Sequence, residues 1–168
     1  MTEVLSRASL LRGRLRGGPP PLRPPWALPE PLFLDRCTRC DDCRRTCPEG
    51  IIVRGSGGFP KIDFRLGECS FCGRCLEACG AKALAAERAR PWTAKAAVGA
   101  ACLAKKGVVC RSCEDVCEPR AIRFEIGRVA SPNVEAALCT GCGACVTACP
   151  VDAIAVAAEE QATYEVLT

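Results

Sequence analysis

Histidine is absent from the 168-residue sequence, and aromatic residues make up only 5% of it. Imidazole is a frequent general base and zinc ligand, so its absence disfavours His-dependent catalysis and mixed Cys/His zinc sites. No nucleophile–base pair and no Gly-rich phosphate loop is found either, and we expect the protein not to be an enzyme. With so few aromatic side chains, a conventional aromatic core is not expected to fill the interior.

Long hydrophobic runs are missing as well. No stretch reaches the ~18 consecutive apolar residues that a membrane span needs. Residues 1–26 also lack the apolar core of roughly 7–15 residues that marks a secretory signal. We therefore expect a soluble, cytoplasmic protein without stable membrane insertion, in a compartment that keeps thiols reduced.

Cysteine is the abundant residue, with sixteen in the chain. Such a density is typical of either a disulfide scaffold or a metal protein, and a reducing compartment favours metal-bound thiolates. The formal charge of +4 counts every cysteine as neutral. Sixteen thiolates on four clusters with +2 cores would bring it to about −4, so the sequence does not indicate a nucleic-acid partner.

The cysteines form four sets with a regular spacing. The last three members of the third and fourth sets lie 32 residues apart, as do all members of the first and second, and the first and third sets are 70 apart over the same three members. A unit of two motifs is therefore used twice. The one irregular cysteine is Cys102, because both offsets indicate position 107, which is Gly107. The sets are 37, 40, 43, 47; 69, 72, 75, 79; 102, 110, 113, 117; and 139, 142, 145, 149.

Three of the sets follow the C-x2-C-x2-C-x3-C spacing of bacterial ferredoxins, which hold [4Fe–4S] clusters. Three thiolates on a tight loop bind one cluster, and the fourth cysteine points away and binds the cluster of the paired motif. This exchange predicts four clusters in four sites. Site A is Cys37, Cys40, Cys43 and Cys79; site B is Cys69, Cys72, Cys75 and Cys47; site C is Cys102, Cys110, Cys113 and Cys149; site D is Cys139, Cys142, Cys145 and Cys117.

Zinc ions and disulfide bonds account for the cysteines less well. Zinc sites usually combine two C-x2–4-C halves or include histidine, and zinc does not account for the ferredoxin spacing. A disulfide framework conflicts with the missing secretory signal and the close spacings. For Cys102 two alternatives stay open. It is either the displaced fourth ligand of site C, with Lys105, Lys106 and Gly107 looped out, or a buried thiol that binds no metal.

The predicted fold is α+β, with tandem bacterial-type 2[4Fe–4S] ferredoxin-like units that consist of short strands and cluster-binding loops or helical turns. Short strands are expected at 50–53, 59–64, 121–124, 127–134 and 153–156, and a helix at 94–106 that ends at Gly107. Because metal binding and folding are coupled, we expect the iron-free protein to be largely unfolded. The predicted divisions are an arm (1–34), a first unit (35–90), a connecting helix and inserted loop (91–109), a second unit (110–158, with Cys102) and a tail (159–168).

The predicted arm is basic and contains eight of the thirteen prolines. Residues 5–16 could form a short amphipathic helix, followed by an extended segment up to Pro31. Two interpretations remain for this arm: a disordered tail, or a docking segment that becomes ordered on a partner.

Several stretches together resemble the NapF family of ferredoxin-type proteins, which belongs to the periplasmic nitrate reductase system. The resemblance implies a cytoplasmic accessory protein with four [4Fe–4S] clusters that contacts the catalytic molybdenum subunit of nitrate reductase before export and aids its maturation. Some relatives carry an Arg-Arg pair near the N-terminus, where this sequence has Ser6-Arg7-Ala8. The stretches are RGRLR, PPWALPE, RCTRCDDC, CPEGIIV, GGFPKIDF, GECSFCGRC, CLAKKGVVCRSCEDVCEPRAIRF and CTGCGACVTACPVDAI.

Three hypotheses for function follow from these features. The first is an accessory or maturation factor for a partner enzyme, which the basic, Pro-rich arm favours. The second is a general soluble electron carrier that serves one or more reductases. The third is a structural iron–sulfur protein that carries no electrons.

Overall fold

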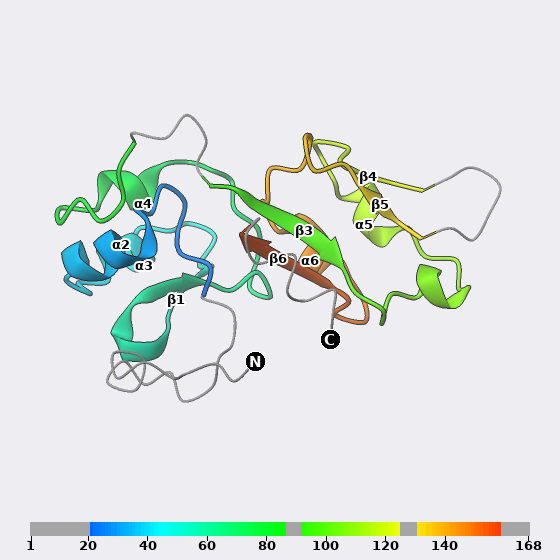
Figure 1. Ribbon diagram of the computed structural model, residues 1–168, viewed down its shortest axis with the longest axis horizontal. Helices are drawn as coiled ribbons and strands as arrows, with labels where there is room; N and C mark the ends of the chain where they lie inside the picture. Colours follow the sequence, from blue (N-terminus) through cyan, green and yellow to red (C-terminus); the bar gives the residue numbers. More distant parts are fainter. Residues whose placement is uncertain (1–20, 87–91, 125–130, 159–168) are drawn as a thin grey trace, which may run out of the picture.

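The computed structural model describes residues 21–86, 92–124 and 131–158, and these form two lobes that lie side by side (Figure 1). The first lobe contains the cysteines up to Cys79, and the second contains those from Cys102 onward. Helices are α2 (Glu30–Arg36), α3 (Asp42–Arg45), α4 (Arg74–Glu77), α5 (Ser112–Asp115) and α6 (Ala144–Thr147), with 3-10 turns η1 (Ser56–Gly58) and η2 (Ala104–Lys106). Strands are β1 (Ile52–Arg54), β2 (Pro60–Ile62), β3 (Ala94–Val98), β4 (Ile122–Arg123), β5 (Asn133–Val134) and β6 (Ile154–Ala158).

The predicted hairpins after the first and third motifs are present. Strands β1 and β2 pair antiparallel, with Ile52 opposite Ile62. In the second lobe β4 pairs with β5, with Ile122 opposite Val134. Ile52 and Ile122 are 70 residues apart, so the hairpins keep the offset found between the motifs. The result supports the tandem arrangement of two ferredoxin-like units.

The predicted helix at 94–106 is wrong, because this stretch begins with strand β3. Strand β3 pairs antiparallel with β6, with Ala96 opposite Val156. Ala94 and Ala96 are buried on the inward face, whereas Lys95 between them is less so. Tertiary pairing has outweighed the helix preference of an Ala-rich stretch. Gly107 does adopt the left-handed conformation of a C-cap (φ 84°), but it ends the single 3-10 turn η2.

The predicted N-terminal arm is also wrong for residues 21–34, which are part of the first lobe. The backbone N–H of Ile62 donates to the Leu22 carbonyl at 2.8 Å, and Ala27 forms a β-bridge with Leu84. Helix α2 follows, and its Phe33 side chain is fully buried. In both lobes, therefore, the segment before the first motif pairs with the segment after the second motif. The predicted helix at 5–16 and the predicted tail lie outside the described residues.

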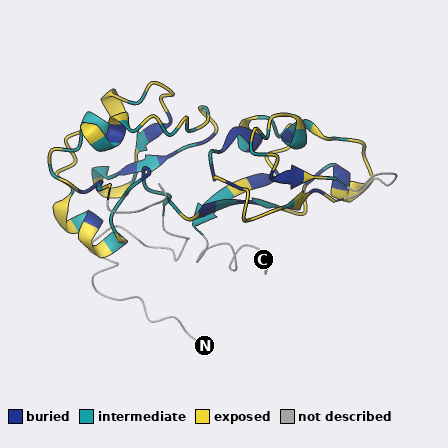
Figure 2. Cartoon of the chain, turned by 90° about the horizontal axis from the view of Figure 1, so that it is seen from above, coloured by how far each residue is buried: buried dark blue, intermediate teal, exposed yellow. Residues whose placement is uncertain are grey.

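Each lobe has a small aliphatic core built around its cysteine motifs (Figure 2). The fourth and fifth positions after every fourth cysteine are buried. They are Ile51-Ile52, Ala83-Leu84, Ala121-Ile122 and Ala153-Ile154. These pairs shield the loops from water at the same place in all four motifs, so few aromatic side chains are needed.

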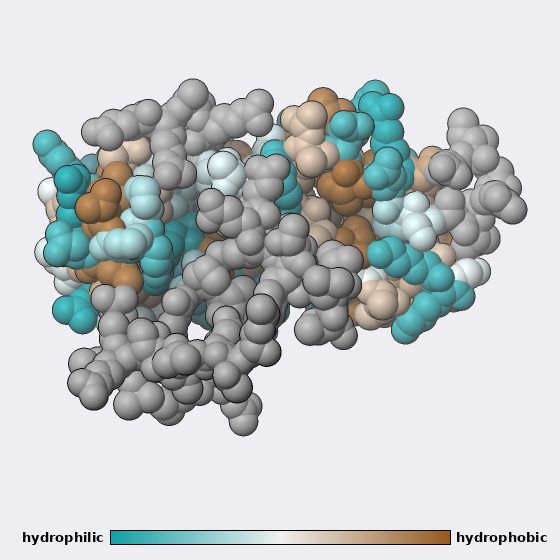
Figure 3. Space-filling model, in the orientation of Figure 1, coloured by the Kyte–Doolittle hydropathy of each residue, from teal (hydrophilic) through white to brown (hydrophobic). Residues whose placement is uncertain are grey.

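Large hydrophobic side chains that remain exposed are distributed over both lobes. Val109 is 83% exposed and Leu66 is 58% exposed. Figure 3 shows hydrophobic and hydrophilic residues interspersed over one face of the two lobes. None of the helices within the described residues is long and apolar enough to cross a membrane.

Candidate iron–sulfur sites

The motif loops share a backbone geometry that the cysteine spacing requires. In the first, second and fourth motifs, the residue before the short helix has a left-handed conformation: Asp41, Gly73 and Gly143, with φ between 67° and 88°. Such turns reverse the chain within two residues of each cysteine and direct successive thiols toward one cavity. The third motif differs, because Arg111 at this position has φ −131°. The altered loop coincides with the displaced Cys102.

A second recurring turn lies three residues after every fourth cysteine. Gly50, Lys82, Arg120 and Asp152 all have positive φ, between 50° and 65°. This conformation is uncommon for residues other than glycine, so its occurrence at three such residues reflects a strong local requirement. The turn brings the following backbone back toward the fourth cysteine. At Cys117 and Cys149 the thiol accepts a backbone N–H at 3.2 Å, from Ala121 and Ala153 respectively.

Three of the four predicted sites coincide with cavities. The cavity at site A has a volume of about 370 Å³, and those at sites B and D have volumes of about 340 and 330 Å³. Each is lined by all four predicted cysteines of its site. These are Cys37, Cys40, Cys43 and Cys79 for site A, Cys47, Cys69, Cys72 and Cys75 for site B, and Cys117, Cys139, Cys142 and Cys145 for site D.

The fourth cysteines are therefore brought to the paired motif, as the exchange of ligands requires. Cys79 lies in the cavity of the first motif, and Cys47 lies in the cavity of the second. In the second lobe, Cys117 lies in the cavity of the fourth motif. Spacing alone suggests this crossing only by analogy with ferredoxins, whereas the structure places the side chains accordingly.

The cysteines of site C gather at the outer part of the second lobe. Cys102 is 8% exposed and packs in one hydrophobic cluster with Ala104 and Ala153, with Cys149 against it. Burial raises the pKa of Cys113 to about 11, and the neighbouring Cys102, Cys110 and Cys149 raise it further. The displaced cysteine therefore lies near the other three predicted ligands, despite its irregular position in the sequence.

The chemistry of the cavities fits a cationic cluster with several metal atoms. Burial is the largest cause that raises the pKa to about 11 at Cys43 and Cys69, and to about 12 at Cys75 and Cys145. Thiolates in such dry surroundings need a cationic partner. Within the described ranges, no three Cys, Asp or Glu side chains converge as they would on a single metal ion. Thiols spaced around a cavity suit a cluster better than a zinc ion.

Additional hydrogen bonds reach the sulfur atoms of the second lobe. The Ala96 N–H donates to Cys139 Sγ at 3.5 Å, and the Ser112 hydroxyl lies 3.8 Å from Cys110 Sγ. Donors of this kind tune the reduction potential of a bound iron–sulfur cluster.

Some residues at these sites were missed by sequence reasoning. Asp41 is buried beside Cys40 and forms ion pairs with Arg44 at 3.3 Å and with Arg54, and these lower its pKa. The positive-φ positions were missed too, although applying the 32- and 70-residue offsets beyond the cysteines would have aligned them. Nothing in the spacing indicates that Arg54 of β1 reaches Asp41, because that contact depends on tertiary packing.

Comparison with known proteins agrees with this architecture. Two segments, residues 36–83 and 108–161, match the family described as a 4Fe-4S dicluster domain. The fold and the sites thus define an iron–sulfur protein of the ferredoxin type that carries [4Fe–4S] clusters. Cys102 lies outside both matched segments, which agrees with its irregular position.

The similar proteins narrow the class to one family. The ferredoxin-type protein NapF of Escherichia coli (strain K12) is 44% identical over 151 residues, which cover 89% of this chain and 92% of the relative. NapF of Haemophilus influenzae is 44% identical over 79% of this chain and 77% of its own length. The chain belongs to the NapF family of ferredoxin-type proteins. It is also similar to the methylamine utilization ferredoxin-type protein MauM of Methylorubrum extorquens, with 37% identity over 76% of this chain and 67% of the relative.

Proposed function

We propose that this chain is a four-cluster accessory protein of periplasmic nitrate reductase that aids maturation or redox activation of the catalytic subunit before export. The observation that carries the proposal is the grouping of sixteen thiols into four sets of four, three of them around cavities of similar size. When bound, [4Fe–4S] clusters supply one-electron transfer. The cysteines of sites A to D would hold one cluster each, including Cys102 at site C.

The chain's own residues determine how such clusters are held. The aliphatic pairs after each fourth cysteine exclude water from the cavities, and the backbone N–H groups of Ala121 and Ala153 stabilise the sulfur atoms. Neither role makes or breaks a substrate bond. We therefore propose a protein that transfers electrons or assists a partner, and not an enzyme.

The proposed partner is the precursor of the catalytic molybdenum subunit of periplasmic nitrate reductase. Support comes from the similarity to NapF proteins over nearly the whole chain. A location in the cytoplasm is proposed with it, because sixteen free cysteines require a reducing compartment and the precursor is present there before export. No nucleic acid and no membrane is included among the proposed partners.

A second candidate function is a general soluble electron carrier. The MauM relatives favour it, because their name refers to methylamine utilization and not to nitrate reduction. A ferredoxin-type protein of this architecture therefore occurs in more than one metabolic system.

Two experiments separate these proposals. In a strain that lacks the gene, the accessory role predicts reduced periplasmic nitrate reductase activity, and in the complemented strain it predicts that the chain co-purifies with the catalytic subunit precursor. Unchanged activity together with no co-purification would contradict that role. Efficient electron delivery by the purified protein to several unrelated reductases would instead favour the general carrier.

A further inference from the structure

The two lobes meet through the loops that line sites B and D. The backbone N–H of Cys69, a ligand of site B, donates to the carbonyl of Cys142, a ligand of site D, at 2.7 Å. Close by, the indole Nε1–H of Trp92 donates to the Thr140 carbonyl at 3.0 Å. Cys142 and Thr140 both line the site D cavity. The contact between lobes is therefore also a contact between the walls of two cavities.

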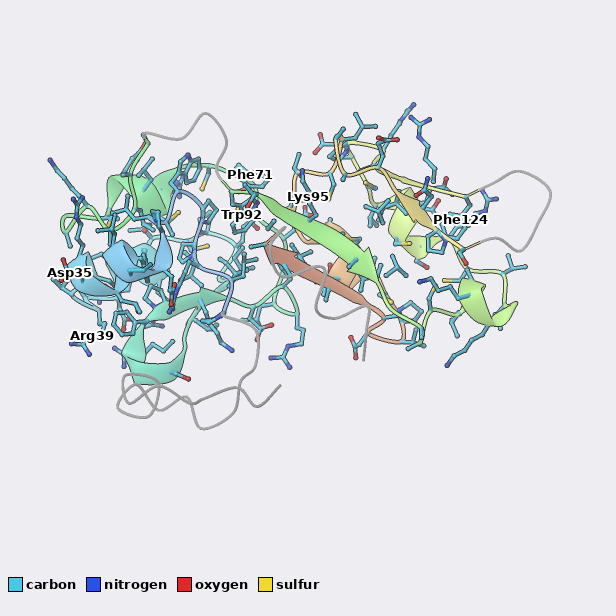
Figure 4. The ribbon with its side chains drawn as sticks, viewed as in Figure 1. Asp35, Arg39, Phe71, Trp92, Lys95 and Phe124 are labelled. Atoms are coloured by element: carbon cyan, nitrogen blue, oxygen red, sulfur yellow. The ribbon has the colours of Figure 1, made fainter. Side chains whose placement is uncertain are left out.

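Aromatic packing strengthens this contact. The Trp92 ring lies edge-to-face with Phe71, which lines the site B cavity, at a centroid distance of 5.7 Å. It makes a second edge-to-face contact with Phe64 at 6.0 Å. Figure 4 shows Phe71 and Trp92 together between the lobes. In a protein with so few aromatic residues, three of them gather at this one place.

Gly143 permits the close approach of the lobes. A Cβ atom at Gly143 would overlap carbon atoms of the Phe64 ring. Gly73 occupies the equivalent position in the second motif, 70 residues earlier, and has a similar φ of 78°. A Cβ atom at Gly73 would meet nothing within 4 Å. The loop conformation explains a glycine at both positions, but only Gly143 is also required by the contact between lobes.

Sites A and C lie away from this contact. The site A cavity is lined only by residues 33–84 of the first lobe, among them Arg39. Cys102 of site C packs only with residues of the second lobe, among them Phe124. Figure 4 shows Arg39 and Phe124 on opposite sides of Phe71 and Trp92 along the length of the molecule.

From these positions we propose that the four sites form one row in the order A, B, D, C, and that Phe64, Trp92 and Gly143 are positioning residues that hold B and D as the inner pair. This inference rests on the proposed binding of four clusters. It goes further by assigning the junction between lobes to one pair of sites. Redox contact between the lobes would then be made at this joint, and the outer sites A and C would face partners at the two ends.

The order is tested with two double variants of the full chain, prepared anaerobically and reduced with dithionite. Cys40→Ala with Cys110→Ala removes one ligand each from sites A and C and retains B and D. Cys72→Ala with Cys142→Ala is the matched control at the equivalent positions, and it retains A and C. Pulsed EPR then measures the dipolar interaction between the remaining clusters. We expect a strong interaction in the first variant and a several-fold weaker one in the second.

The positioning residues are tested in the otherwise unaltered chain with Gly143→Ala and Gly73→Ala. Both substitutions strain a left-handed turn, but only Gly143→Ala displaces Phe64. We expect Gly143→Ala to weaken the interaction between lobes at unchanged iron content, and Gly73→Ala to leave it as in the parent. Trp92→Phe, which loses the indole donor and keeps a ring, is the milder variant if Gly143→Ala does not fold.

The outcomes distinguish this inference from the proposed function. About eight iron atoms in the parent chain would contradict the four-cluster proposal itself, because four clusters contain about sixteen. About sixteen iron atoms, with the stronger dipolar interaction in the variant that retains A and C, would overturn the order of sites alone. Equal weakening by Gly143→Ala and Gly73→Ala would overturn the role of the joint.

Discussion

Phe33 shows how the segment before the first motif supports site A. Its side chain is fully buried in α2 and lines the site A cavity. The Phe59 ring lies 6.3 Å away between centroids, and the Arg23 guanidinium lies 4.9 Å from the Phe33 centroid. Replacing Phe33 with alanine would remove one wall of the cavity and admit water to the cysteines.

The expected magnitude follows from this burial. A Phe→Ala change in a packed core lowers the free energy of unfolding by about 3–5 kcal/mol. The loss is a large share of the total stability of a typical domain, about 5–15 kcal/mol. Leu32, the preceding residue of the same helix, is 49% exposed. Leu32→Ala should therefore cost only about 1 kcal/mol and serves as the matched control.

The assay is the anaerobic decay of the visible iron–sulfur absorbance in moderate denaturant with an iron chelator. If the Phe33 contacts form late in folding, Phe33→Ala should accelerate the decay by at least about 10²-fold, and Leu32→Ala by about 10-fold or less. Iron should leave site A first. Equal decay rates for the two variants would refute the conclusion that residues 21–36 form a wall of site A.

Three further predictions concern the cysteines. Cys102→Ala should remove about four iron atoms or produce a three-iron EPR signal, whereas unchanged iron content and spectra would identify Cys102 as a buried thiol without a metal. Removal of iron by a chelator should abolish the near-ultraviolet circular dichroism, since metal binding and folding are coupled, and a retained native spectrum would contradict this coupling. Cluster assembly at pH 7 should release protons measurable in a pH-stat and should become more favourable as pH rises, because burial raises the pKa of Cys43, Cys75 and Cys145 and the ligands must be deprotonated; uptake independent of pH would argue against thiolate ligation.

The repeated cysteine spacing predicted most of the architecture around the sites. Because the offsets of 32 and 70 residues recur, they indicated two lobes and the hairpins at Ile52 and Ile122. The short loops leave few ways to direct three thiols toward one cavity. For this reason the local geometry of the motifs could be predicted from the sequence.

Features that depend on distant segments could not be predicted in the same way. The Ala-rich stretch at 94–98 has a local preference for helix, and only its pairing with β6 makes it a strand. The prolines around Pro24 and Pro25 suggested an extended arm, yet both side chains are fully buried in the first lobe. The joint at Trp92 has no motif, because it brings together residues from three separate parts of the chain.

Iron and acid-labile sulfide per chain, quantified after anaerobic purification, test the central claim most directly. Four [4Fe–4S] clusters predict about sixteen atoms of each per chain, together with the EPR signals of reduced [4Fe–4S] clusters. About eight atoms of each would contradict the four-cluster assignment, because half of the sixteen cysteines would then bind no cluster.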